Sequence, residues 1–191
     1  MQIIRKYSNY KEYLKHQKEK SLNTHRIKKW LGVEWKPKVE MFLSHFKRNK
    51  KYLVKGGKAL GICARTGQEI EALNTLGMKA VGVDIVPYPP LVIFGDAHKL
   101  PFNCKRFDFV FSNSFDHSIS PKVFISEMLR VIKTGGYGML HLQLTDEVDV
   151  YAENILTDEK PVLELLEGVK IVENREVNDI CYNREIVFRK L

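Results

Sequence analysis

The stretch KALGICARTGQEIEALNTLGMKAVGVD, residues 58–84, decides the fold of this chain. Residues 58–63 form a short apolar run that is typical of a buried strand, and residues 80–85 form a second one. Between them Gly67 precedes an amphipathic segment, and Gly77 ends it as a left-handed helix cap. The apolar residues of that segment recur three apart, as in a helix: Ile70, Leu73 and Leu76. A strand, a helix and a strand in this order predict one unit of a parallel sheet.

The same alternation continues to the end of the chain. Further strands are expected at residues 91–95, 107–113 and 137–144, with helices at 121–132 and 161–166. Two last strands, near residues 171–177 and 184–188, predict an antiparallel closing pair, which is common on such sheets. The predicted fold class is α/β: a Rossmann-like doubly wound sheet, mostly parallel with an antiparallel closing strand, plus an N-terminal helical arm.

The arm precedes the first strand. Tyrosines at spacings of three predict a helix over residues 1–22, and Pro37 is expected to open a second helix at its favoured first-turn position. The composition changes near Gly57. We therefore divide the chain into a basic helical arm, residues 1–57, and a domain of residues 58–191.

Charge is spread unevenly between these two parts. Residues 1–55 hold 16 Lys and Arg against four Glu, a net charge of +12, whereas the rest of the chain has a net charge of −4. Such a basic segment attracts polyanions, and the Tyr and Trp side chains among its charges can stack on bases. Nucleic acid bound through residues 1–55 is therefore a candidate partner. The alternative is an ordinary solvated helical face.

Composition also limits the setting in which the protein works. No apolar run approaches the roughly 20 residues that span a bilayer, and the first 20 residues lack the apolar core of a signal peptide. Cys63, Cys104 and Cys181 lie far apart without a CxxC pair, which argues against a disulfide framework or a zinc site. We expect no metal, and an intracellular location that is cytoplasmic or nuclear.

Polar residues follow the predicted strands at their carboxyl ends, where ligands bind in open α/β sheets. Asp84 ends the second strand, 17 residues after Gly67, where a carboxylate can accept both hydroxyls of a ribose. Asp96 ends the third strand, and residues 112–117 follow the fourth. Each has a structural alternative, because Asp84 can cap a turn, Asp96 can form an Asx turn and Gly67 can simply allow one.

Five segments together resemble the motifs of class I S-adenosylmethionine-dependent methyltransferases, with the methyltransferase type 11 family as the nearest group. The resemblance covers residues 58–144, nearly half of the chain. The segment at 95–102 is the most specific of the set. The five segments are ALGICARTG at 59–67, VGVD at 81–84, GDAHKLPF at 95–102, FDFVFSN at 107–113 and RVIKTGG at 130–136.

This resemblance implies S-adenosyl-L-methionine as the cofactor. By it, Asp84 would bind the ribose diol, Asp96 would accept from the adenine amine, and Ala97 would offer backbone groups to the ring. The loop of residues 63–67 would hold the methionine part. The full set of cofactor-binding residues that it implies is Cys63, Ala64, Arg65, Gly67, Asp84, Ile85, Asp96, Ala97 and Asn113.

The first motif departs from the family pattern, which begins with an acidic residue and runs Gly-x-Gly-x-Gly. Gly61 stands at the acidic position, and Cys63 and Arg65 stand at the first two glycine positions. Their side chains would crowd the cofactor. Arg65 would either point outward or reach the cofactor carboxylate. A dinucleotide site fits less well, because of its three glycines only Gly67 remains.

The predicted function is S-adenosylmethionine-dependent methyl transfer to an unidentified acceptor. His117, in the loop after the fourth strand, is the candidate general base, and the alternative is a loop histidine without a chemical role. The arm could also fold over the crevice. A second function stays open: a non-catalytic methyltransferase-like module that binds nucleic acid or a protein partner through its basic arm.

Overall fold

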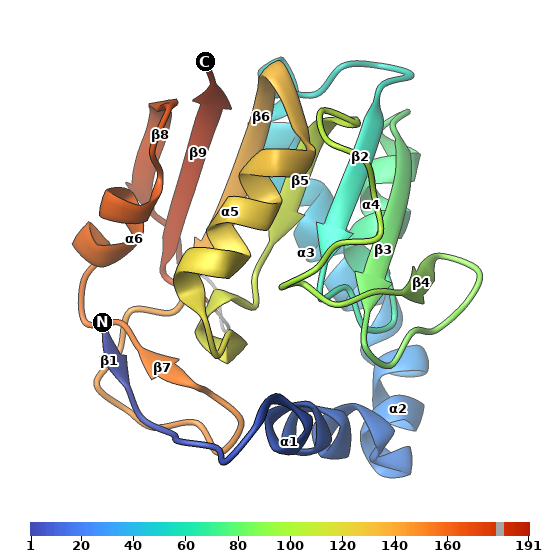
Figure 1. The fold of residues 1–191 in the computed structure, drawn as a ribbon. Helices are drawn as coiled ribbons and strands as arrows, with labels where there is room; N and C mark the ends of the chain where they lie inside the picture. Colours follow the sequence, from blue (N-terminus) through green and yellow to red (C-terminus); the bar gives the residue numbers. More distant parts are fainter. Residues whose placement is uncertain (179–181) are drawn as a thin grey trace.

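A seven-stranded sheet forms the middle layer of the computed structural model, which describes residues 1–178 and 182–191 (Figure 1). The strand order is β4-β3-β2-β5-β6-β9-β8, and β9 runs antiparallel to both of its neighbours. The predicted doubly wound fold is confirmed. Cys181 lies outside the described residues. The strands are β2 Lys58–Ile62, β3 Lys79–Asp84, β4 Val92–Phe94, β5 Phe107–Ser112, β6 Ile132–Leu142, β8 Val169–Glu176 and β9 Arg184–Lys190.

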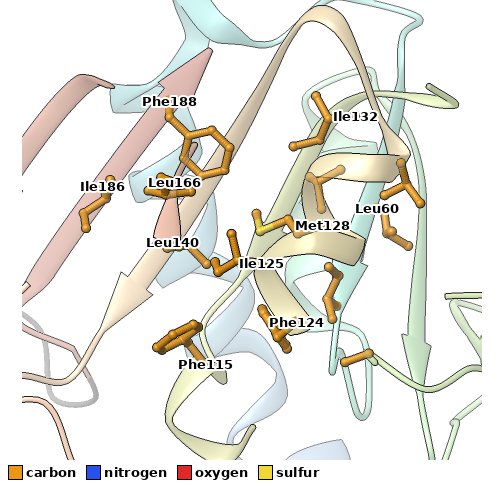
Figure 2. Packing of buried hydrophobic residues seen from close by; sticks show 14 of the residues in the cluster. Leu60, Phe115, Phe124, Ile125, Met128, Ile132, Leu140, Leu166, Ile186 and Phe188 are labelled. Atoms are coloured by element: carbon orange, nitrogen blue, oxygen red, sulfur yellow. The ribbon is translucent and has the colours of Figure 1, made fainter. Parts of the chain in front are cut away.

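Helices cover both faces of the sheet (Figure 1). Helices α5 (Pro121–Val131) and α6 (Lys160–Leu165) lie on one face, and α3 (Trp35–Arg48) and α4 (Gln68–Thr75) lie on the other. The sheet is buried on both sides because successive side chains of β5 alternate between two apolar clusters. Figure 2 shows the first cluster, where α5 packs against β6 and β9.

The arm is built differently from the sequence prediction. The first helix, α1 (Tyr10–Leu22), begins at Tyr10 rather than at residue 1, because Asn9 caps it by accepting from the backbone N–H of Glu12. Before it, β1 (Gln2–Ile3) pairs antiparallel with β7 (Asn154–Ile155). A separate helix, α2 (Thr24–Leu31), follows.

The structure also differs from the sequence prediction in smaller details. Helix α3 begins at Trp35, two residues before Pro37. Two short 3₁₀ helices, η1 (Lys50–Tyr52) and η2 (Phe115–His117), were not predicted. Among the described residues, no helix combines the length and the apolarity that crossing a membrane requires.

Helix α3 is part of the hydrophobic core although it precedes the predicted domain. Phe42 and Phe46 are almost completely buried and pack edge-on against Phe111 of β5. Burying one such side chain contributes roughly 1.5–3 kcal/mol. This packing fixes the C-terminal part of the arm to the sheet. Figure 1 shows that α1 then crosses beneath the carboxyl ends of the parallel strands.

A buried ionic cluster adds a second tie between α3 and the sheet. The carboxylate of Glu185 on β9 is fully buried and accepts hydrogen bonds from His141, Arg48, Asn49 and Arg175 at 2.7–3.1 Å. Burial opposes its ionisation, but hydrogen bonds from His141, Arg48 and Asn49 hold the pKa of Glu185 well below its ordinary value. The cluster therefore depends on the charge of this one carboxylate.

We expect Glu185→Gln to lower the free energy of unfolding at pH 7 by about 1.5–3 kcal/mol, because the buried carboxylate loses charge-assisted hydrogen bonds to Arg48 and Arg175, which are themselves partly exposed. The pKa of Glu185 is lower in the folded state, so its contribution is complete above its ordinary value of 4.5 and is lost as the pH falls below it. Urea denaturation should show a smaller cost at pH 3.5 than at pH 7. Glu176→Gln, at an 87% exposed side chain, is the control. An equal cost of Glu185→Gln at both pH values would contradict this account.

Candidate functional site

The loop between β2 and α4 keeps a glycine-like backbone although two of its residues have side chains. Cys63 has φ 60°, Arg65 has φ 49° and Gly67 has φ 91°, all in the left-handed region. An L-residue pays roughly 1–2 kcal/mol for this conformation. Residues 63 and 65 therefore carry side chains on a backbone conformation that glycine adopts most readily.

Close packing explains the glycine at position 61. A Cβ on Gly61 would come within 2.6 Å of Ile70, and one on Gly82, its partner on β3, would come within 2.6 Å of Ala64. Helix α4 therefore lies directly against these two strands, and an acidic residue at position 61 would overlap it. Gly67 is similarly constrained, since a Cβ there would lie 2.9 Å from Leu91.

Asp84 ends β3 with its carboxylate nearly buried. One carboxylate oxygen accepts from the backbone N–H of Arg65 at 2.9 Å, and the other accepts from that of Val86 at 2.8 Å. Burial raises the pKa of Asp84 above its ordinary value, although these amides oppose the shift. The side chain thus ties the loop after β2 to the end of β3. It lies between the two segments that were predicted to hold one ligand.

Asp96 follows β4 and is bound by the arm. Its Oδ2 accepts from the Tyr10 hydroxyl at 2.6 Å, and its Oδ1 accepts from the backbone N–H of His98 at 2.8 Å. The ring of His98 also lies 3.2 Å from Oδ1 and reaches Ser118 through its other nitrogen. Burial opposes ionisation, but the hydrogen bonds from His98 and Tyr10 lower the pKa of Asp96. A tyrosine of α1 therefore occupies one oxygen of the predicted adenine acceptor.

Two adjoining cavities lie at this edge of the sheet. One, of about 50 Å³, is lined by Asp84, Asp96 and the arm residue Tyr13. The other, of about 330 Å³, lies between Trp30 of α2 and Tyr182 beside β9. The two share five lining residues: Lys20, Cys63, Arg65, Ser114 and His117.

The structure brings most of the sequence-predicted residues to these cavities. Cys63, Arg65 and His117 line both. The smaller cavity adds Asp84, Ile85, Asp96 and Ala97, and the larger one adds Ala64 and Asn113. Gly67 lines neither, because it turns the chain into α4.

Residues of α1 that the sequence interpretation did not select also line the site. Tyr13, Gln17 and Lys20 face the cavities, and the hydroxyl of Tyr13 donates to the backbone oxygen of His117 at 3.1 Å. The spacing of three and four in the sequence was the available signal, since it places Tyr10, Tyr13 and Gln17 on one helical face. The arm therefore folds over the crevice, which is one of the roles that the sequence analysis considered for it.

Arg65 does not simply point into solvent. It lines both cavities, and its guanidinium carbon lies 4.3 Å from the ring centroid of Trp30, in a cation–π contact. The backbone oxygen of Trp30 in turn accepts from the Gln68 side chain at 2.9 Å. The arm thus holds the arginine at the edge of the larger cavity.

His117 has both ring nitrogens engaged. Its Nδ1 lies 2.7 Å from the backbone oxygen of Tyr151, and its Nε2 lies 3.1 Å from Nζ of Lys20. Burial lowers the pKa of His117, and the nearby Lys20 charge acts in the same direction. The side chain is therefore held neutral and in a fixed orientation.

The family model described as "Methyltransferase domain" matches residues 60–140. No curated protein matches the chain. Three solved structures show the same fold at low sequence identity. The PH0226 protein from Pyrococcus horikoshii has 21% identity and a TM-score of 0.64, covering 78% of this chain and 90% of that one. A SAM-dependent methyltransferase from Aquifex aeolicus has 16% identity and a TM-score of 0.61, covering 93% and 98%.

The third structure is the Burkholderia thailandensis 1,6-didemethyltoxoflavin-N1-methyltransferase, which was solved with 1,6-didemethyltoxoflavin and S-adenosylhomocysteine bound. It has 14% identity and a TM-score of 0.71, covering 98% of this chain and 93% of that one. Residues 60–140 of the present chain thus match a methyltransferase family model, the chain shares its fold with these solved structures, and the motif residues of this segment converge on one crevice.

Proposed function

We propose that this chain binds S-adenosylmethionine across the two adjoining cavities and transfers its methyl group to a small acceptor in the larger one. The observation that carries the proposal is the convergence of Asp84 and Asp96, from two different strands, on one cavity. Ribose hydroxyls and an adenine amine are donors, and both need acceptors of this kind.

The two carboxylates retain the capacity to accept further hydrogen bonds. An ionised carboxylate offers about four acceptor sites. Asp84 uses two of them on backbone amides, and Asp96 uses up to three, on the Tyr10 hydroxyl and on the backbone N–H and ring of His98. The acceptors that remain fit the donors of an adenosine group. The space is more restrictive, because about 50 Å³ is far below the roughly 300 Å³ of a small ligand pocket. Tyr10 and Tyr13 must move aside for adenosine to enter.

The larger cavity has groups for the charged end of the cofactor. Arg65 supplies a cation for a carboxylate, and Glu69, at the N-terminus of α4, lies in the same lining. Burial raises the pKa of Glu69 to about 7, so an ammonium group beside it would favour its ionised form. The remaining volume, near Phe42 and Tyr182, is available for an acceptor.

S-adenosylmethionine supplies an electrophilic methyl group when it is bound. The residues of the chain then have three tasks: to bind the adenosine, to align the acceptor and to exclude water. His117 borders both cavities, and we propose that it takes part in removing the acceptor's proton. The retained carboxylate acceptors, Asp84 and Asp96, favour this function over the non-catalytic module.

We expect Asp84→Asn and Asp96→Asn each to weaken S-adenosylmethionine binding about 10- to 100-fold, because a hydrogen bond to a charged group contributes roughly 1.5–3 kcal/mol. Isothermal titration calorimetry measures the change, and circular dichroism checks that each variant folds. Asp146→Asn, at an exposed position outside the cavity linings, is the matched control. Wild-type affinity in both site variants would overturn the assignment of this cavity to adenosine.

We also propose that the basic arm of residues 1–57 attracts nucleic acid. Lys11, Lys15, Lys28 and Lys29 are exposed on α1 and α2. The aromatic part of the earlier interpretation does not hold for the buried rings of Tyr13 and Trp30, which pack against the site instead of facing outward. The attraction would therefore be electrostatic.

The quadruple variant with glutamate at Lys11, Lys15, Lys28 and Lys29 should bind single-stranded RNA at least 10-fold more weakly than the wild type. Wild-type affinity should fall steeply between 50 and 200 mM salt, because binding releases counterions. Fluorescence anisotropy measures both effects. Charge reversal is preferred to deletion of the arm, since α3 is part of the core. Binding that does not respond to salt would argue against this partner.

Two broader proposals rest on the sequence alone. One is the division into an arm of residues 1–57 and a domain of residues 58–191, although Phe42 shows that the arm contributes to the core. The other is an intracellular location, cytoplasmic or nuclear, which rests on the wide separation of the cysteines.

A further inference from the structure

Lys20 lies at the junction of the two cavities, beside His117. Under the proposed function, the smaller cavity takes adenosine and the larger one takes the acceptor. The methyl group must then pass at their junction. Lys20 comes from the arm, outside the segment that the methyltransferase family model matches.

The contacts of His117 fix the role of each nitrogen in the pair. A backbone carbonyl only accepts, so Nδ1 of His117 donates to the oxygen of Tyr151. In the neutral ring Nε2 is then an acceptor, and it accepts an N–H of Lys20 across 3.1 Å. This hydrogen bond occupies Nε2. It also orients Nζ of Lys20, a residue that lines both cavities.

Charged groups from every neighbouring element face Lys20. Arg65 of the loop after β2 and Arg26 of α2 disfavour its positive charge, whereas Asp116 and Asp149 favour it. The ring centroid of Tyr151 lies 5.2 Å from Nζ. Burial is the largest influence, and it lowers the pKa of Lys20 from 10.5 to about 8. Roughly a tenth of the Lys20 side chains are therefore neutral amines at pH 7, and about half are neutral at pH 8.

We propose that Lys20 is the general base of this enzyme, that His117 is the residue that positions it, and that the acceptor is a small molecule with an ionisable O–H or N–H group. The argument rests on the shared cavity lining and on the hydrogen bond from Lys20 to Nε2 of a histidine that is itself held by Tyr151. A base is needed only for such a protic acceptor, since a thioether or tertiary amine has no proton to lose.

The acceptor's proton passes to the lone pair of Lys20 Nζ, which becomes an ammonium. The acceptor's lone pair forms a bond to the methyl carbon of the sulfonium, and the electron pair of the broken carbon–sulfur bond stays on sulfur. The products are the methylated acceptor, the neutral thioether S-adenosylhomocysteine and protonated Lys20.

The amine form of Lys20 is tested without any acceptor. The full-length protein is labelled competitively with 1-fluoro-2,4-dinitrobenzene between pH 6 and 11, and the labelled lysines are quantified by mass spectrometry. We expect the reactivity of Lys20 to rise with a midpoint near pH 8, and exposed Lys122 on α5 is the internal reference. A midpoint for Lys20 equal to that of Lys122 would overturn the proposal.

Measurements of kcat distinguish a general base at position 20 from a lysine that acts only as a structural cation. With phenols and primary amines as probe acceptors and S-adenosylhomocysteine release as the readout, wild-type kcat should rise between pH 7 and 9, because the amine form is the reactive one. Lys20→Arg keeps the charge but cannot lose a proton, so kcat should fall about 100-fold or more. Lys122→Arg should leave it unchanged. Full kcat in Lys20→Arg would overturn the assignment.

The kinetic constants of His117 variants test its positioning role separately. His117→Ala should lower kcat with little change in the KM for S-adenosylmethionine, and His117→Gln, whose side-chain oxygen can still accept from Lys20, should recover part of the loss. Calorimetry keeps the two proposals distinguishable. A wild type that does not bind S-adenosylmethionine would refute the proposed function, whereas Lys20 labelling gives its own result without cofactor.

Discussion

The structure depends on the burial of two phenylalanines of α3 against β5. Phe42 and Phe46 lose their solvent-exposed surface only if α3 lies on the sheet, and that position leads the preceding residues to the carboxyl ends of the parallel strands. The charge of Glu185 holds the far end of the same helix through Arg48 and Asn49. The basic arm is therefore a wall of the site, and its charges are divided between the crevice and the solvent.

The sheet could be predicted from the sequence because its signals are local. Residues 58–84 carry a strand, a helix and a strand with apolar periodicities of their own, and the strand ends place Asp84 and Asp96 at one edge without any knowledge of distant contacts. The contacts of the arm are of another kind. Tyr10 reaches Asp96 across 86 residues of sequence, and Lys20 reaches His117 across 97. No periodicity of α1 encodes those partners.

In the loop after β2, the glycine motif is incomplete but the backbone conformation that glycine favours is present. Cys63 and Arg65 break the glycine pattern, yet both adopt the left-handed conformation for which glycine is selected. Sequence reasoning could identify the missing glycines but not the left-handed conformation of Cys63 and Arg65. It also could not foresee Trp30, which takes the guanidinium of Arg65 as a cation–π partner and keeps this long side chain at the cavity edge.

One helix thus serves two needs that oppose each other. Tyr10 and Tyr13 of α1 take up the space beside Asp84 and Asp96, so adenosine can enter only when this end of the helix moves. Lys20 lies about two to three turns further along the same helix and meets His117 only where the helix is docked. Burial, which lowers the pKa of Lys20, likewise requires the docked helix. Adenosine binding therefore requires movement at the start of α1, whereas the proposed proton removal requires the part of α1 around Lys20 to stay in place.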